Sequence, residues 1–121
     1  MLEEKFRNQK EFFDTTIEYF HKDKLTDRDK ILWAKEYILS TVKELCEFLD
    51  ELPWKLHRID SRKIDKEKVL EELIDVQKFV WNLFHLFEIT SEDIERMYDL
   101  KSKIVVERWK TFLEEKNNDC N

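Results

Sequence analysis

The segment KEKVLEELIDVQKFVWNLFHLF (Lys66–Phe87) carries a broad helical pattern. Its apolar residues recur at intervals of three and four positions, which places them along one side of an α-helix. Phe79, Trp81 and Leu86 widen this stripe further. We therefore predict that a helix beginning after Asp65 lies at the centre of the fold and is covered on most of its sides. The stripe consists of Val69, Leu70, Leu73, Val76, Val80, Leu83, Phe84 and Phe87.

Two helices are predicted before this segment. The first spans residues 2–21, where phenylalanine and isoleucine side chains are spaced for one helix face. The second begins near Thr26, a suitable N-cap in the sequence TDRD, and continues to Leu52. Pro53 ends it, because proline has no backbone N–H to donate to the helix. Cys46, in the middle of this second helix, is expected to be a small buried hydrophobic residue.

A fourth helix is predicted from Thr90 or Ser91, either of which can cap it, to about Glu114. The pattern favours an all-α, four-helix-bundle-like fold, completed by a second copy of the chain. We expect residues 1–115 to form a single all-α domain and residues 116–121 to form a polar C-terminal tail.

The composition excludes several kinds of structure and chemistry. The chain has 121 residues, no glycine and one proline, Pro53. Tight β-hairpin turns favour glycine, so a β-rich fold is not expected. Glycine-rich loops that hold phosphates with backbone amides are excluded as well. A protein of this composition that binds phosphates must use metal ions and Lys or Arg side chains.

The net charge and the cysteines bear on the binding partners and the cellular location that we expect. The formal net charge of −6 argues against broad nucleic-acid binding, which depends on cationic side chains. We expect no signal peptide, since residues 1–10 are charged throughout, and no apolar run is long enough to span a membrane. Cys46 and Cys120 form no disulfide framework, so a reduced cytoplasmic location is predicted.

Acidic residues recur beside the apolar stripes of the second and third helices. At roughly 100° per residue, Glu44, Glu47 and Glu51 fall within about 60° of one another. Glu72 and Asp75 repeat the three-residue spacing at the edge of the next stripe. If these two helices face each other, the pairs form a cluster of four carboxylates.

Such a cluster is unfavourable unless cations neutralise it, and its hard oxygen ligands suit Mg²⁺ or Mn²⁺. Glu71 is an alternative to Glu72, because a helix brings either residue onto the side of Asp75. The competing interpretation is a solvated acidic face, since 28 of the 121 residues are Asp or Glu.

The order of these acidic pairs resembles that of the all-α nucleoside triphosphate pyrophosphohydrolases, the MazG-like enzymes and dimeric dUTPases. The resemblance extends from about Leu2 to Trp109 and includes the first helix, both acidic helices and a later helix with a lysine and an arginine. The segments that carry it are LEEKFRNQKEF, KELCEFLDELPWK, KVLEELIDVQKFVWNL and YDLKSKIVVERW.

The resemblance implies hydrolysis of a nucleoside triphosphate to the monophosphate and diphosphate, a reaction that maintains the nucleotide pool. It implies that Glu44, Glu47, Glu72 and Asp75 bind two or three Mg²⁺ ions, with Mn²⁺ as a possible substitute. Glu47 is implied as the residue that orients and deprotonates the attacking water. The family pairs its chains, so a homodimer or homotetramer is expected.

Residues that contact the substrate are implied in the same way. Lys55, Lys101 and Arg108 are expected to contact the phosphates, Trp54 to stack on the base and Gln9 to read its edge. For the three cations the alternative is solvated surface charge, for Trp54 hydrophobic packing, and for Gln9 simple exposure.

The chain departs from the dimeric dUTPases in its last motif. Ser102 and Val105 stand where those enzymes have asparagines, so the resemblance favours a wider (deoxy)nucleoside triphosphate range. A dedicated dUTPase is the alternative within this class. A non-catalytic helical interaction module is the alternative outside it.

Overall fold

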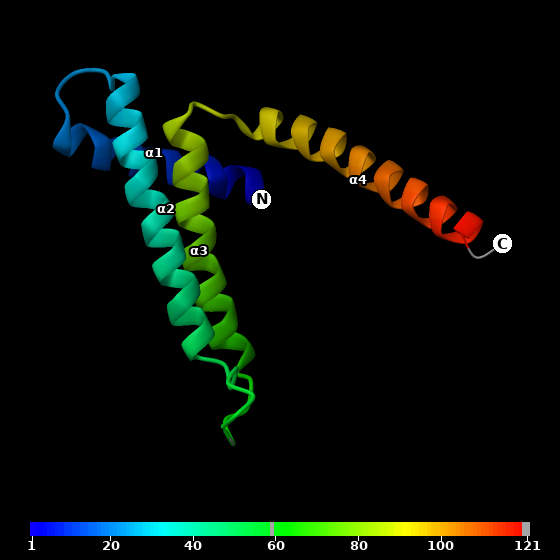
Figure 1. Ribbon diagram of the computed structural model, residues 1–121. Helices are drawn as coiled ribbons and strands as arrows, with labels where there is room; N and C mark the ends of the chain where they lie inside the picture. Colours follow the sequence, from blue (N-terminus) through cyan, green and yellow to red (C-terminus); the bar gives the residue numbers. More distant parts are fainter. Residues whose placement is uncertain (59, 120–121) are drawn as a thin grey trace. The chain divides into compact units, whose positions relative to one another are not determined.

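The computed structural model describes residues 1–58 and 60–119, which form four α-helices and no β-strand. The helices are α1 (Leu2–Phe20), α2 (Asp27–Asp50), α3 (Lys66–Leu86) and α4 (Ser91–Asp119) (Figure 1). The predicted all-α fold is confirmed over these residues. None of the described helices is both long and apolar enough to cross a lipid bilayer. Cys120 lies outside the described residues.

The chain divides into two compact units, Met1–Glu88 and Ile89–Asn121. The first unit contains α1, α2 and α3, and the second contains α4. The assignment of residues 1–115 to a single domain stays a prediction.

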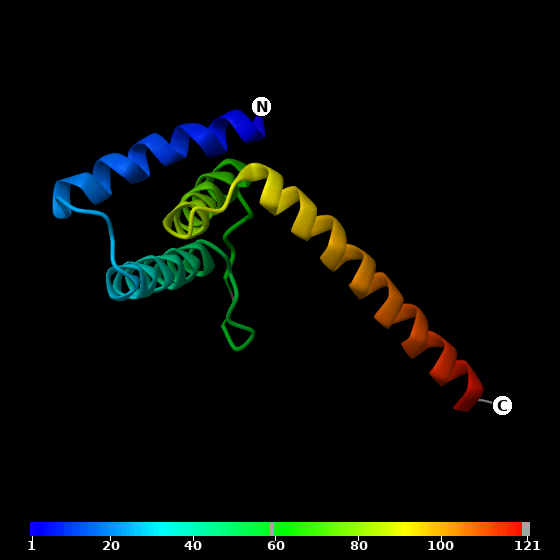
Figure 2. The same cartoon turned by 90° about the horizontal axis from the view of Figure 1, so that it is seen from above.

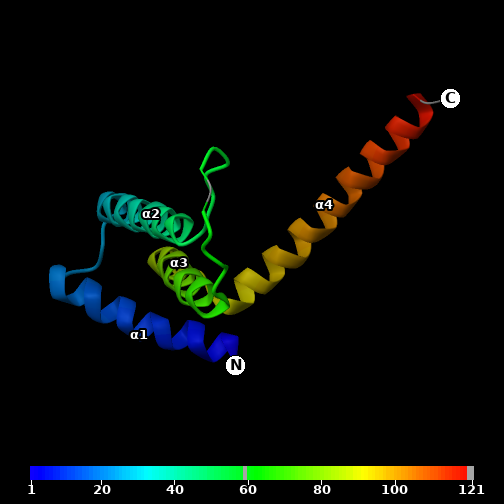
Figure 3. The ribbon, with the colours of Figure 1, turned by 90° about the horizontal axis from the view of Figure 1, so that it is seen from below.

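Helix α3 lies between α1 and α2 in the first unit (Figures 2 and 3). Helices α2 and α3 run antiparallel and side by side, and α1 crosses on the other side of α3. The buried residues of α3 are confined to its C-terminal half, at Asn82, His85 and Leu86. In its N-terminal half, Leu70 and Leu73 remain 48% and 45% exposed. The predicted central place of this helix therefore holds, but only half of its length is well covered.

The core of the unit is aromatic and small. Phe13 of α1, Tyr37 of α2 and Leu86 of α3 form a buried cluster, with Ile17, Trp33 and Phe79 among the side chains packed around it. Phe6 is also buried, and its ring meets that of Trp81 edge-on at a centroid distance of 5.5 Å. Full burial of such side chains contributes about 1.5–3 kcal/mol each. One or two substitutions here would therefore remove much of the stability of the unit.

Side-chain caps begin three of the helices. At α2, Thr26 Oγ1 accepts a hydrogen bond from Asp29 N–H, and Asp29 accepts one from Thr26 N–H. The Asp65 carboxylate accepts from the first backbone amides of α3, and Thr90 caps α4 in the same reciprocal way with Asp93. These bonds satisfy N–H groups that have no partner inside a helix. The predicted starts of all three helices are correct.

Two helix ends differ from the prediction. Helix α2 ends at Asp50 rather than Leu52, because a residue that precedes proline is disfavoured in the helical conformation, and Leu52 precedes Pro53. Helix α4 extends to Asp119 rather than Glu114. The segment EEKNND contains no glycine or proline to end the helix, and Lys116 places a positive charge near its negative C-terminal end.

Helix α3 ends without the glycine that commonly follows a helix. Glu88 takes the left-handed conformation there, with φ of 57°, and its N–H donates to His85 O at 3.1 Å. This conformation costs a residue with a Cβ atom about 1–2 kcal/mol. The chain accepts this cost at one position among the described residues.

The expectation that Cys46 is buried is wrong: its side chain is exposed. Cys46 lies between Glu44 and Glu47, two positions from the half-buried Glu44, and two residues correspond to about 200° around a helix. Cys46 therefore points away from the side of α2 on which Glu44 meets α3.

His85 joins α3 to α1 through a buried polar contact. Its Nε2 lies 2.9 Å from the backbone oxygen of Phe6. Because a carbonyl oxygen can only accept, Nε2 must carry the hydrogen. Burial lowers the pKa of His85 below its ordinary value, although the hydrogen bond to Phe6 acts in the opposite direction.

This burial predicts a specific sensitivity to acid. Below about pH 6.5 an unfolded histidine takes up a proton, whereas the lowered pKa of His85 shifts its protonation in the folded chain to more acidic pH. The unfolded state then binds more protons, so the free energy of unfolding falls as the pH decreases. The variant His85→Gln lacks this contribution, and the stability advantage of the wild type over it should shrink between pH 7.5 and pH 5. Urea unfolding at both pH values measures the difference.

The exposed His57, replaced by Gln in the same way, is the matched control for loss of a histidine. A constant stability difference between wild type and His85→Gln across this pH range would contradict the account.

Candidate metal centre

Three acidic side chains from two helices meet where α2 packs against α3. One carboxylate oxygen each from Glu44, Glu72 and Asp75 lies within 4.8 Å of the others. Glu44 stands on α2, and the other two stand one turn apart on α3. Glu44 and Glu72 are half-buried, and Asp75 is exposed. The antiparallel packing of the two helices therefore brings together side chains that are about thirty positions apart in the sequence.

The electrostatic state of these carboxylates reflects their proximity. Partial burial raises the pKa of Glu44 above its ordinary value, and the negative charges of Glu47, Asp75 and Glu72 raise it further. Partial burial and the charges of Asp75 and Glu47 raise the pKa of Glu72 in the same way. Each charge thus makes ionisation of its neighbours less favourable. A bound cation would remove this penalty.

Glu47, the fourth predicted ligand, lies at the edge of the cluster. It is not one of the three groups within 4.8 Å, but its negative charge contributes to the raised pKa of both Glu44 and Glu72. On its other side Lys43 Nζ lies 4.0 Å from Glu47 Oε1. The four predicted acids are therefore neighbours, with Glu47 the most peripheral of them.

Glu71 and Glu72 differ in their position relative to this group. Glu72 belongs to the group of three, whereas Glu71 is an exposed neighbour whose charge contributes to the raised pKa of Glu72. Glu51, one turn after Glu47, is a second acidic neighbour of Glu72.

The donor set fits a hard divalent ion. Octahedral Mg²⁺ binds oxygen at about 2.1 Å, so opposite ligands stand about 4.2 Å apart. The spread of 4.8 Å exceeds this by an amount that rotation of partly exposed side chains can close. Carboxylates without thiolate or imidazole favour Mg²⁺ or Mn²⁺ over softer metals. Among the described residues this is the one group with such a geometry.

The loop between α2 and α3 carries Trp54 and Lys55. The Lys55 ammonium lies 5.5 Å from the centre of the Trp54 ring, within the range of a cation–π contact. Both side chains line a hollow of about 250 Å³ next to the C-terminal end of α2. The other residues that line it are Asp50, Leu52, Arg58, Asp60 and Arg62.

Gln9 contacts another side chain rather than standing exposed. Its Nε2 donates a hydrogen bond to Asn82 Oδ1 at 3.0 Å, and Asn82 is buried on α3. This bond crosses from α1 to α3, and it fixes which end of the Gln9 amide faces Asn82.

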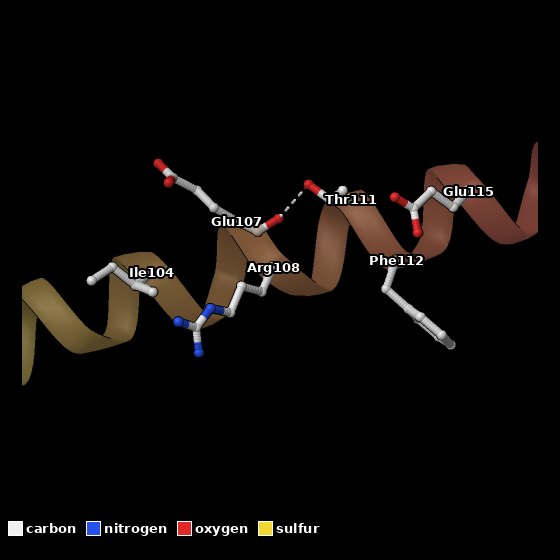
Figure 4. A pocket seen from close by; sticks show the side chains of 6 residues that line it. All are labelled: Ile104, Glu107, Arg108, Thr111, Phe112 and Glu115. Atoms are coloured by element: carbon white, nitrogen blue, oxygen red, sulfur yellow. Dashed lines mark hydrogen bonds between the residues drawn. The ribbon is translucent and has the colours of Figure 1, made fainter.

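Lys101 and Arg108 lie on α4, in the second unit, with both side chains exposed. Arg108 projects from the same side of the helix as Ile104 and Phe112, along a shallow hollow on the surface of α4 (Figure 4). The spacing of seven residues between Lys101 and Arg108 brings both to one face of the helix.

Arg62 and Asn82 form contacts that sequence patterns did not indicate. Arg62 hydrogen-bonds the Asp60 carboxylate and two backbone carbonyls at the end of α2. Asn82 holds Gln9 from a buried place within an apolar stripe. Asn82 could have been noticed in the sequence, because it is a polar residue inside an apolar pattern. The contacts of Arg62 depend on the conformation of an irregular loop, which the sequence pattern does not indicate.

Comparison with known proteins agrees with the geometry. The model of a protein family described as dUTPase matches residues 1–117. Comparisons with curated proteins and with solved structures find no match. The family match covers both acidic helices, the loop between them and nearly all of α4. The chain belongs to the dUTPase family.

Proposed function

We propose that this protein hydrolyses dUTP to dUMP and diphosphate in a reaction that depends on Mg²⁺. The observation that carries the proposal is the convergence of carboxylates from α2 and α3 in a chain of the dUTPase family. Family membership supports a hydrolase that acts on nucleoside triphosphates and implies a divalent metal. The choice of Mg²⁺ and of dUTP belongs to the proposal.

The proposed metal ligands are Glu44, Glu47, Glu72 and Asp75. When bound, divalent ions would neutralise phosphate charge and lower the pKa of a coordinated water. The side chains contribute hard oxygen donors from two rigid helices. Because their mutual repulsion is already present in the folded chain, cation binding would relieve an unfavourable interaction.

Glu47 is the proposed general base. A base must remain able to take a proton while the other carboxylates are engaged. Glu47 is exposed and stands at the edge of the cluster, beside Lys43 rather than within the group of three. This place suits a carboxylate that orients a water molecule and accepts its proton.

The substrate contacts are assigned to cationic, aromatic and amide side chains. Lys55, Lys101 and Arg108 would bind the phosphates, a task that a chain without glycine cannot give to a loop of backbone amides. Trp54 would stack on the base. Gln9 donates to Asn82 through Nε2, so its Oε1 would accept a hydrogen bond from the base.

A wider range of nucleoside triphosphates is the second candidate function. It is favoured by Ser102 and Val105, which offer no carboxamide for recognition of a base. Diphosphate release across canonical and modified nucleotides separates the two candidates. Comparable kcat/KM for dUTP and several other nucleotides would favour the wider range.

We also propose that the protein forms a homodimer or a dimer of such dimers. Leu45 and Leu49 of α2 and Leu70 and Leu73 of α3 keep 39–48% of their surface exposed. Apolar side chains in one region at this exposure are typical of a surface that another chain covers. In its own unit α4 has no second described helix to pack against.

The acidic cluster predicts opposite effects of one substitution with and without metal. Replacement of Glu72 by Gln removes a charge that its neighbours disfavour, so the variant should melt at a higher temperature than the wild type in EDTA. Mg²⁺ at a hundred times its Kd should raise the free energy of unfolding of the wild type by about 2.7 kcal/mol. Most of this gain should be lost in Glu72→Gln. Thermal unfolding with and without Mg²⁺ measures both effects.

The exposed Glu71, replaced by Gln, is the control for loss of a neighbouring charge and should keep the response to Mg²⁺. An equal Mg²⁺ response in wild type and Glu72→Gln would rule out the cluster as the binding site.

The role of Glu47 predicts a loss of rate without a loss of fold. General acid–base contributions are about 10²- to 10⁴-fold, so Glu47→Gln should lower kcat for dUTP by at least about a hundredfold. Its circular dichroism spectrum should match that of the wild type. The control Glu36→Gln alters an exposed acid elsewhere on α2 and should leave kcat unchanged. A Glu47→Gln variant with normal kcat would show that another group accepts the proton.

The assembly proposal predicts a particle of at least twice the chain mass of 15.1 kDa. Light scattering coupled to gel filtration at micromolar concentration measures it. The exchange Leu45→Glu should weaken the assembly, because a charge would then stand in the covered surface, whereas Leu56→Glu in the exposed loop should not. A monodisperse wild-type monomer would contradict the proposal.

A further inference from the structure

Arg62 holds the loop between α2 and α3 through several groups at once. Its Nε and Nη2 donate to the Asp60 carboxylate, with the nearest contacts at 2.9 and 2.8 Å. Its Nη1 donates to Asp50 O at 2.8 Å, and Nη2 also donates to Leu52 O at 3.2 Å. The backbone N–H of Arg62 donates to Asp60 Oδ1 at 3.0 Å. One guanidinium therefore binds the loop to the end of α2.

Arg62 contacts the carbonyl oxygens of Asp50 and Leu52, which lie just before Trp54 in the chain. Asp50 is the last residue of α2, and the final carbonyls of a helix have no partner within it. Leu52 O also accepts a hydrogen bond from Trp54 N–H at 2.9 Å, which closes a tight turn around Pro53. Arg62 thus contacts the same oxygen that defines this turn. Trp54 and Lys55 follow immediately.

The contacts of Arg62, which we call the Arg62 clamp, also lie close to the acidic helices α2 and α3. Glu51, which directly follows the last residue of α2, interacts electrostatically both with Arg62 and with Glu72. The loop held by Arg62 is therefore connected to the helix end one turn beyond Glu47. A shift in the turn would move Trp54 and Lys55 relative to the carboxylates while the helices themselves stayed in place.

We propose that Arg62, clamped to Asp60 and to the carbonyls of Asp50 and Leu52, is a positioning residue that holds Trp54 and Lys55 ready for the nucleotide. The inference rests on the proposed function, because it assigns Arg62 a part in binding the same substrate. Arg62 acts through the loop and does not itself contact the reacting atoms. The guanidinium is required, since a lysine ammonium has no planar fork to reach a carboxylate and two carbonyls together.

The test compares Arg62→Ala and Arg62→Lys with the control Lys63→Ala, which removes a neighbouring positive charge from the same loop. Backbone hydrogen exchange of residues 51–64, followed by mass spectrometry without nucleotide, reports on the loop directly. Both Arg62 variants should exchange faster there, whereas Lys63→Ala and peptides from the middle of α2 and α3 should match the wild type.

In both Arg62 variants the KM for dUTP should rise about tenfold, as expected when a charge-assisted contact loses its preorganisation, with a smaller change in kcat. Binding of Mg²⁺ alone, measured by calorimetry, should be unchanged.

The possible results distinguish a failure of the positioning role of Arg62 from a failure of the proposed function. Wild-type loop exchange in Arg62→Ala would overturn the clamp, and so would a normal KM in Arg62→Lys. Equal effects of Arg62→Ala and Lys63→Ala on KM would show that only charge matters and would also overturn it. If the wild type hydrolyses no nucleotide, the proposed function fails and the positioning role fails with it. Normal wild-type hydrolysis with unaffected Arg62 variants removes the positioning role alone.

Discussion

The close approach of like charges between α2 and α3 is the constraint on which the rest of the structure depends. Three carboxylate oxygens within 4.8 Å of one another repel, and burial of Glu44 and Glu72 adds a further cost to their ionisation. The helices nevertheless stay together because apolar side chains on the same faces pack against each other. The chain therefore tolerates an unfavourable site at the place where two stable helices meet. The positive charge of a bound cation would offset this cost.

The proposed site divides its tasks between rigid and irregular structure. The acids stand on helices, whose geometry fixes the spacing of Glu72 and Asp75. Trp54 and Lys55 stand in a loop without glycine, and this loop takes its shape from Pro53 and from the contacts of Arg62. Side-chain hydrogen bonds fix the shape of this loop, whereas in glycine-rich sites the backbone conformation of glycine fixes it. The partly buried Gln9–Asn82 bond is a similar case, in which one polar side chain orients another.

Much of the fold followed from the sequence, because periodicity and capping residues are local signals. Thr26, Asp65 and Thr90 predicted where three helices begin, and the apolar stripe predicted that α3 has a central place in the fold. The ends of α2 and α4 were less well predicted, since helix ends depend on small energetic differences between neighbouring residues. The exposure of Cys46 was missed because the side of α2 that faces α3 is set by packing.

The candidate site was predictable to the extent that it lies on helices. Helical spacing placed Glu44, Glu72 and Asp75 at the edges of two apolar stripes, and the structure brings these three together. The resemblance already favoured Glu72 over Glu71, whereas the peripheral position of Glu47 required coordinates. The contacts of Arg62 could not be predicted, because they join residues through the fold of a loop rather than through a regular repeat. The roles assigned to Lys101, Arg108, Trp54 and Gln9 stay predictions.

The most direct measurement of the central claim is anomalous X-ray diffraction from crystals of the protein grown with Mn²⁺. The account predicts an anomalous peak at coordination distance, about 2.2 Å, from carboxylate oxygens of Glu44, Glu72 and Asp75. A well-ordered structure in which these side chains point apart into solvent, with no peak between α2 and α3, would contradict it.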